Sequence, residues 1–77
     1  MALIQKEKII RLDKERNSIH STVNCTYTSF ELEGKKIFQL DTYGSSDRQH
    51  PEKISQSLQI DQEVAKMLIG LFMKELF

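Results

Sequence analysis

The chain has few of the residues on which disulfides, metal sites and membrane spans depend. It holds one cysteine, Cys25, so an internal disulfide and a cysteine-rich metal site are both excluded. No apolar run approaches the roughly 18 residues of a membrane-spanning helix, so we expect no membrane partner. The 11 basic side chains balance the 11 acidic ones, which leaves no overall field to attract a polyanion such as duplex DNA. With only three glycines, the sequence also has no phosphate-binding glycine loop.

Candidate catalytic and metal-binding residues are sparse. His20 and His50 stand at no ligand spacing from Cys25 or a carboxylate, so we expect no metal site and no cofactor. Cys25 lies among apolar residues, and we expect a buried, inert thiol there. Asp41 and Asp47 flank the predicted loop that holds Ser45 and Ser46, and turn formation explains all four residues. We therefore predict no catalytic residue and no enzymatic activity, in a cytoplasmic protein without a secretory signal.

The length of 77 residues allows one small domain. Residues 1–17 are rich in helix formers without a continuous apolar stripe, and we interpret them as an N-terminal arm or a short helix. Five cations against three anions give this segment a charge of +2, which suits either a solvated surface or a basic arm for an acidic partner. Residues 18–77 are predicted to form the domain proper.

Alternating apolar and polar residues predict strands in three places. A strand rich in β-branched and aromatic residues is expected from Ile19, and Glu33-Gly34-Lys35 is typical of a hairpin turn. Residues 36–43 and 53–60 alternate in the same way, with a Gly-, Ser- and Pro-containing loop between them. The predicted fold class is α+β, a three- to four-stranded antiparallel β-meander followed by a C-terminal amphipathic helix.

The last predicted strand has an unusual polar face. One side holds hydrogen-bonding residues at a period of two, namely Lys53, Ser55, Ser57 and Gln59. The opposite side is predicted to hold Ile54, Leu58 and Ile60. Such a row beside a loop that contains Tyr43, Arg48 and His50 suggests a surface that binds something polar.

The C-terminal helix is predicted to begin after Asp61, whose carboxylate caps the first turn, with Glu63 favourable to the helix dipole. Apolar residues then recur at three- and four-residue spacing to the end of the chain. We expect Leu68, Ile69 and Phe72 to bind the sheet. The remaining apolar surface predicts a homodimer, with an interface formed by Met67, Leu71 and Met73.

An open antiparallel sheet of this kind is able to bind single-stranded nucleic acid, because aromatic rings stack on bases while cations neutralise phosphates. Tyr27, Phe30 and Tyr43 are the candidate rings, and Lys35 is a further candidate cation. The predicted nucleic-acid-binding residues are Lys36, Tyr43, Arg48, Lys53, Ser55, Ser57 and Gln59. In the alternative interpretation, the aromatics are core residues, the lysines keep the sheet edges from aggregating, and the partner is a protein.

Residues 53–61 and the helix after them resemble the end of the positive-cofactor-four family of transcriptional coactivators. In those proteins a lysine-rich last strand with a serine near its end leads directly into an amphipathic helix. The resemblance covers about the last third of the chain, which lacks the aromatic residue that the family commonly places in the first turns of the helix. It implies a curved four-stranded sheet with a helix, in a dimer that grips single-stranded DNA.

A second resemblance involves residues 38–45, Arg48, Lys53 and residues 55–57. These look like segments of small uncharacterised bacterial and phage-borne proteins, some of which carry a methionyl-tRNA formyltransferase label. That label implies a folate-dependent enzyme, but 77 residues cannot supply such a fold and no Asn-His-Asp constellation is visible. The two function classes that stay open are a dimeric module for single-stranded nucleic acid and a non-catalytic protein-interaction module, such as an accessory subunit or a regulator.

Overall fold

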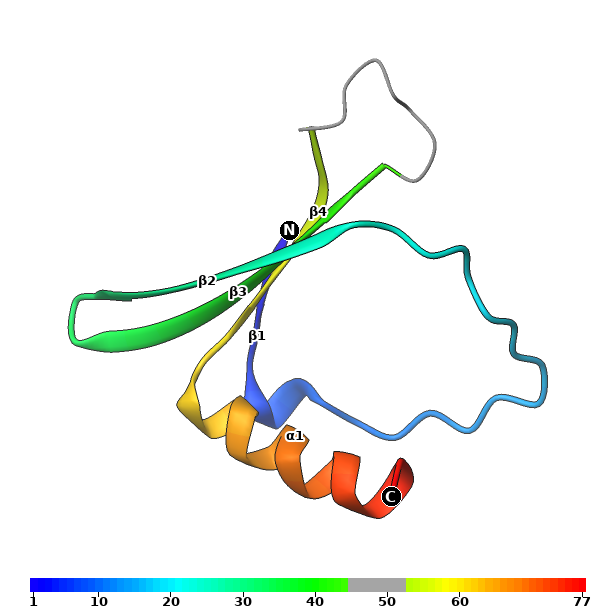
Figure 1. Cartoon of the computed structure of the whole chain (residues 1–77). Coiled ribbons are helices and arrows are strands. Elements are labelled where there is room, and N and C mark those ends of the chain that lie inside the picture. The colour runs from blue at the N-terminus through cyan, green and yellow to red at the C-terminus, as the bar shows by residue number, and fades with distance from the viewer. Residues whose placement is uncertain (45–52) are drawn as a thin grey trace.

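The computed structural model describes residues 1–44 and 53–77, which form one mixed sheet and one helix (Figure 1). The sheet has the strand order β1-β4-β3-β2, and the helix follows β4 directly. The elements are β1 (Ala2–Ile4), a 3₁₀ helix η1 (Lys6–Lys8), β2 (Cys25–Leu32), β3 (Lys35–Tyr43), β4 (Ile54–Ile60) and α1 (Gln62–Glu75). The predicted α+β class, with an antiparallel meander before a C-terminal helix, is confirmed.

The hairpin between β2 and β3 turns at the predicted place. Glu33 and Gly34 both have positive φ values, 53° and 79°, as a tight two-residue hairpin turn requires. Glycine takes this conformation without a steric penalty, whereas Glu33 takes it at some cost. The antiparallel pairing of β2 with β3 then runs from Leu32↔Lys35 to Cys25↔Thr42.

The N-terminal segment supplies a strand that the sequence analysis missed. Ala2–Ile4 pairs in parallel with the end of β4, with Ala2 opposite Leu58 and Ile4 opposite Ile60. The expected helix is reduced to the single turn of η1, and residues 9–24 then run without helix or strand to β2. The strand predicted from Ile19 therefore begins six residues later, at Cys25. Residues 9–24, which only partly overlap the N-terminal arm expected over residues 1–17, are called the arm below.

A shift in register changes which face of the sheet Ile54 occupies. Thr42 pairs with Gln56 whereas Tyr43 pairs with Ile54, so Ser55 is an extra residue in β4. A bulge of this kind breaks the alternation of side chains along a strand. Residues directly opposite each other share a face, which places Ile54 with Tyr43. The predicted grouping of Ile54 with Leu58 and Ile60 was wrong for this reason.

The two faces of the sheet differ in chemistry. The apolar face carries Ala2, Ile4, Cys25, Tyr27, Phe38, Leu40, Leu58 and Ile60, as the strand registers show. The polar face carries Thr26, Thr28, Gln39, Asp41, Tyr43, Ser57 and Gln59, with Leu3, Phe30, Ile37 and Ile54 around them. The sheet therefore has one face suited to hydrophobic burial and one suited to hydrogen bonding.

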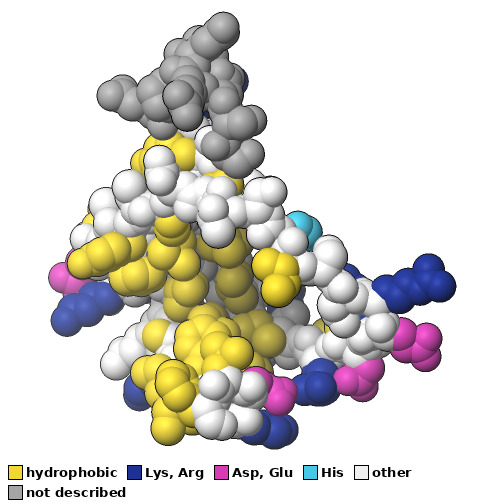
Figure 2. Space-filling view, turned by 45° about the vertical axis from the view of Figure 1, so that its right-hand side comes forward, with side chains coloured by type: hydrophobic (Ala, Val, Ile, Leu, Met, Phe, Trp, Pro, Cys, Tyr) yellow, Lys and Arg dark blue, Asp and Glu magenta, His cyan; other side chains and the backbone are white. Residues whose placement is uncertain are grey.

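Helix α1 begins as predicted. Asp61 is the N-cap, and its Oδ1 accepts a hydrogen bond of 2.9 Å from the backbone N–H of Val64. The helix lies on the side of the apolar face, where Gln62 and Ala65 line a hollow together with Phe38 and Ile60. In Figure 2 apolar side chains gather in the space between sheet and helix.

Burial in the single chain is slight. Among the described residues, Ile37 and Val64 are the only buried hydrophobic side chains. Helix residues Ile69 and Phe72, which were expected to bind the sheet, are 63% and 48% exposed, so that expectation was wrong. The helix turns its Val64 side inward, where Met67, Leu68 and Leu71 follow at three- and four-residue spacing and are half-buried, whereas Ile69 lies round the helix.

The molecule is also more expanded than its length requires. Its radius of gyration is 14.7 Å, whereas a compact domain of this length has about 11.5 Å. Its accessible surface is 7,422 Å², against roughly 4,900 Å² for a compact monomer of this mass. The single chain thus exposes a large amount of surface that compact proteins of this size bury.

Candidate binding surfaces of the sheet

A chain of side-chain hydrogen bonds crosses the polar face from β4 to β3. Ser57 Oγ and Gln39 Nε2 both donate to Asp41 Oδ1, the second over 2.9 Å. Gln59 Nε2 in turn donates to Gln39 Oε1 over 2.8 Å. The register produces this chain, because Asp41 stands opposite Ser57 and Gln39 stands opposite Gln59. The four side chains hold one another in fixed orientations on the sheet surface.

Asp41 is the charged residue at the centre of this chain. The hydrogen bond from Ser57, followed by that from Gln39, holds the pKa of the Asp41 carboxyl below its usual value, because both bonds favour the ionised form. Asp41 and Ser57 are both buried. Asp41 therefore stays ionised at neutral pH, and its negative charge repels phosphate groups from the middle of the polar face.

Two further groups extend the polar face toward its outer strand. The hydroxyls of Tyr43 and Thr26 lie 3.0 Å apart and share a hydrogen bond. Tyr43 is half-buried, and Thr26 is exposed. The Tyr43 ring is thus held over β2 by its own hydroxyl, with part of its surface open to a ligand.

The structure brings together only some of the predicted nucleic-acid-binding residues. Tyr43, Ser57 and Gln59 share the polar face, and Lys53 and Ser55 are exposed at its end, before and within the bulge. Lys36 lies on the apolar face instead, opposite Glu31 of β2. Arg48 and the rest of residues 45–52 lie outside the described residues.

Gln39 is a polar-face residue that the sequence analysis missed, and Lys35, named there as a further candidate cation, also lies on this face. Lys35 pairs with Leu32 at the hairpin end, on the same face as Gln39 and Asp41. The signal was present in the sequence, because residues 35, 37, 39 and 41 share a face by simple alternation. Lys35 therefore stands at the hairpin end of the polar face, and Lys53 directly precedes β4 at the opposite end of the sheet.

The apolar face carries an exposed aromatic pair. The rings of Tyr27 and Phe38 are stacked, with centroids 5.3 Å apart and an angle of 15° between their planes, although Tyr27 is 69% exposed. Cys25 lies on this face as predicted, but its thiol is exposed and not buried, since no element covers this end of β2 in the described structure. Large exposed apolar surfaces of this kind mark interaction sites.

The predicted dimer residues lie at different depths on α1. Met67 and Leu71 are half-buried, whereas Met73 is exposed. A second set is exposed throughout and lies on one side of the helix at three- and four-residue spacing, namely Ile69, Phe72 and Leu76. These three residues are called the outer helix stripe below.

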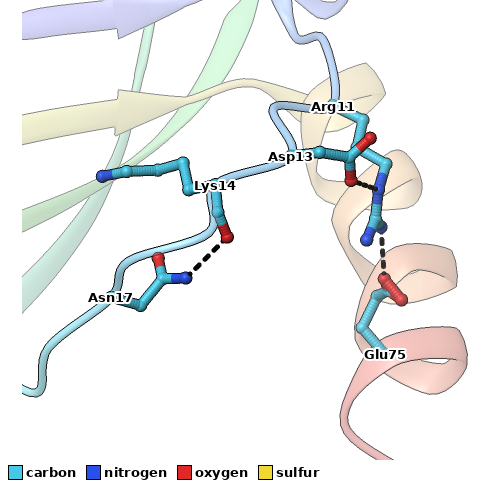
Figure 3. Close-up of polar contacts among 5 residues, drawn as sticks. All are labelled: Arg11, Asp13, Lys14, Asn17 and Glu75. Carbon is cyan, nitrogen blue, oxygen red and sulfur yellow. Dashed lines mark hydrogen bonds and ion pairs between the residues drawn. The ribbon is translucent and has the colours of Figure 1, made fainter.

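An ion pair ties the arm to the far end of the helix (Figure 3). Arg11 donates to Asp13 Oδ1 from Nε and to Glu75 Oε2 from Nη1, each over 2.8 Å. These contacts raise the pKa of Arg11, and the hydrogen bond from Arg11 lowers the pKa of Glu75. Further along the arm, Asn17 Nδ2 donates to the backbone oxygen of Lys14 over 3.0 Å. Arg11 thus fixes the first part of the arm beside α1.

Searches for metal clusters and membrane spans give negative results within the described residues. Residues 1–44 and 53–77 contain no group of three or more His, Cys, Asp or Glu side chains able to hold a metal ion. In the same part of the chain, no helix combines the length and the apolar character needed to cross a membrane.

Comparison with known proteins identifies no relative. No protein-family model matches the chain, and no curated protein or solved structure matches it either. The functional argument therefore rests on the surfaces described above.

Proposed function

We propose that the protein is a homodimeric, non-catalytic module that binds single-stranded nucleic acid across the polar face of its sheet. The observation that carries this proposal is the polar face itself, where Gln39 and Gln59 are half-buried, hydrogen-bonded to each other and uncovered by the helix. Amide side chains fixed in this way are suited to hydrogen bonds with the edges of unpaired bases.

The charged residues near the polar face favour one arrangement of the phosphates and bases of a bound nucleic-acid strand. Asp41 repels phosphates from the centre, whereas Lys35 at the hairpin end of the face and Lys53, just before β4 at the opposite end of the sheet, attract them. Bases then lie over the middle of the face, beside Phe30 and Tyr43, whose rings are half-buried and available in part for stacking. The balanced net charge of the chain disfavours duplex DNA, which is bound mainly through phosphate neutralisation.

The homodimer is proposed because one chain lacks a sufficient core. Its accessible surface exceeds that of a compact monomer by roughly 2,500 Å². A standard interface buries about 800 Å² from each partner, and large obligate homodimers bury more. A second copy is always present with the first, and it covers the apolar faces while leaving the polar faces open. Cys25 is a free thiol, which suits the reducing cytoplasm as the place where the module works.

The proposal is tested by titrating labelled single-stranded and duplex oligonucleotides at low and moderate salt. We expect the single strand to bind more tightly than the duplex. We also expect its affinity to fall with added salt, with a logarithmic slope of about −0.7 for each neutralised phosphate. Absence of binding to any oligonucleotide at low salt would contradict the proposal.

A protein-interaction module is the second candidate, favoured by the outer edge of β2. This strand has eight residues, and within the described part of the chain no strand pairs with its outer edge. It contains neither proline nor lysine, and Glu31 is its single charged residue, so the edge has few protections against further pairing. An extended peptide is able to add to such an edge by backbone hydrogen bonds. Binding of this kind depends weakly on salt, which separates it from phosphate binding.

A further inference from the structure

The arm exposes apolar side chains along an extended path. Ile10, Leu12 and Ile19 are 82%, 72% and 100% exposed, and Val23 is also exposed. In Figure 1 the arm leaves the helix, runs well away from the sheet and returns to the start of β2. Connections of more than about 12–15 residues without secondary structure are uncommon in compact domains and are usually either functional or linker segments. The length and the exposed apolar side chains of the arm (residues 9–24) therefore indicate that it packs against another surface.

The arm is fixed at its two ends. Near its start, Arg11 is bound to Glu75 of α1. At its end, the backbone oxygen of Asn24 accepts a hydrogen bond of 3.1 Å from the backbone N–H of Tyr43. Between these points, the side-chain hydrogen bonds found among the described residues are local to the arm, such as that from Asn17 to Lys14. The middle of the arm is therefore held out from its own sheet and helix.

The same chain exposes a surface that matches the arm in chemistry. The outer helix stripe presents Ile69, Phe72 and Leu76 to solvent, and the stacked Tyr27 and Phe38 lie open on the apolar face. Within one chain the arm does not cover these apolar side chains. In a two-fold dimer, however, the arm of each copy is able to cover the apolar surface of the other, because the symmetry forms the same contact twice.

We propose that the arm of each chain lies across the apolar surface of a second copy, with Leu12 and Ile19 packed against the partner's outer helix stripe. This inference rests on the homodimer in the proposed function and adds the segment and the surface that form it. The excess surface of the single chain, roughly 2,500 Å², is enough for a large obligate interface from each subunit. The Arg11–Glu75 pair then holds the start of the arm at the C-terminal end of its own helix, and the residues that follow cross to the other copy.

The first test places a charge on the apolar side chains of the arm. Leu12→Asp combined with Ile19→Asp is compared with Ser18→Asp combined with Ser21→Asp, which adds the same charge at two exposed polar positions of the same arm. The dimer dissociation constant is measured by analytical ultracentrifugation. We expect an increase of at least 100-fold for the first pair and less than threefold for the serine pair. Equal effects of the two pairs would overturn the inference.

The second test does not depend on the stability of a variant. A photoactivatable phenylalanine analogue replaces Ile19, and copies with ¹⁵N label are mixed with unlabelled copies before irradiation. We expect cross-linked peptides that join residue 19 of one isotope to residues 62–76 of the other, which include the outer helix stripe. Cross-links confined to one isotope, or directed elsewhere than the helix, would overturn the arm inference.

The outcomes separate this inference from the proposed function. If the parent protein dimerises through the arm but binds no oligonucleotide, the arm inference stands and nucleic-acid binding fails. If the parent protein is a monomer at 100 times the concentration used for oligonucleotide titration, the arm inference and the homodimer of the proposed function both fail, while nucleic-acid binding by the polar face is still measured directly.

Discussion

Ser57 donates a hydrogen bond to Asp41 across the pairing of β4 with β3, and both side chains are buried. This contact divides the polar residues of β4 into two kinds. Ser57 and Gln59 fix the side chains of the polar face through their hydrogen bonds to Asp41 and Gln39. Lys53 and Ser55, by contrast, are exposed near the start of β4. The strand thus combines a structural part with a part that is open to a ligand.

The first prediction concerns the two serines. Ser57→Ala removes a donor from a buried carboxylate, and we expect the thermal midpoint to fall by roughly 4–8 °C, as for the loss of one hydrogen bond in a domain of this size. Ser55→Ala is the matched control, since Ser55 is exposed in the bulge and no hydrogen bond from its side chain is found among the described residues. Its midpoint should stay within about 1 °C of the parent value. Differential scanning calorimetry measures both, and similar midpoints for the two variants would disprove the structural role of Ser57.

The second prediction concerns acid. The folded-state pKa of Asp41 is lowered, so its contribution to stability is present above its unfolded value of about 3.9 and is lost as the pH falls through the folded value. We therefore expect the urea midpoint of the parent protein to fall more steeply below pH 4 than that of Asp41→Asn. Glu75 contributes with the same sign in both proteins, because its pKa is also lowered. Parallel pH profiles for parent and variant would contradict this assignment.

Some features of the fold were predicted from the sequence, and others were missed. The hairpin at Gly34 and the helix start at Asp61 were predicted because their causes are local, a positive φ in one case and a side-chain cap in the other. Strand β1 was missed because three residues carry no clear period and their pairing with β4 is remote in sequence. A strict period of two also misplaced Ile54, since the bulge at Ser55 is not visible in the alternation.

The candidate site was predicted in part for the same reasons. Ser57 and Gln59 were found by alternation, but their partners Asp41 and Gln39 come from β3, and only the register shows that they meet. Lys36 was assigned to the wrong side of the sheet relative to Ser57, because the sequence does not show which face of β3 continues the face of β4.

The third prediction concerns the helix. Phe72→Lys places a charge on the outer helix stripe, and we expect it to raise the dimer dissociation constant by at least tenfold, because a dry interface does not accommodate an unpaired ammonium group. Lys66→Glu, on an exposed polar position of the same helix, should leave the constant within about threefold. Leu71→Lys should also weaken the dimer, with some loss of stability since Leu71 is half-buried. Sedimentation velocity over a concentration series distinguishes these results, and a parent protein that is monomeric throughout would refute the prediction.

The fourth prediction concerns Lys35 on the polar face and Lys53, which directly precedes β4 at the opposite end of the sheet. Lys35→Ala combined with Lys53→Ala removes two phosphate contacts, so we expect the slope of logarithmic affinity against logarithmic salt to become shallower by about 1.4 for single strands. The affinity should fall about equally for all sequences, because phosphate contacts carry no base information. Lys36→Ala combined with Lys74→Ala removes the same charge from other surfaces and serves as the control. Equal salt slopes for the two double variants would mean that the nucleic acid binds somewhere other than the polar face.

The central claim is that single-stranded nucleic acid binds across the polar face of the sheet, and nuclear magnetic resonance tests it most directly. The side-chain amide signals of Gln39 and Gln59 are followed in two-dimensional ¹H–¹⁵N spectra as a single-stranded oligonucleotide is added at low salt. The account predicts that these signals and the backbone amides of Thr26 and Thr28 shift together, while those of Ile69 and Phe72 on the helix stay in place. Shifts confined to the apolar face or the helix, or no shifts at a saturating concentration, would contradict it.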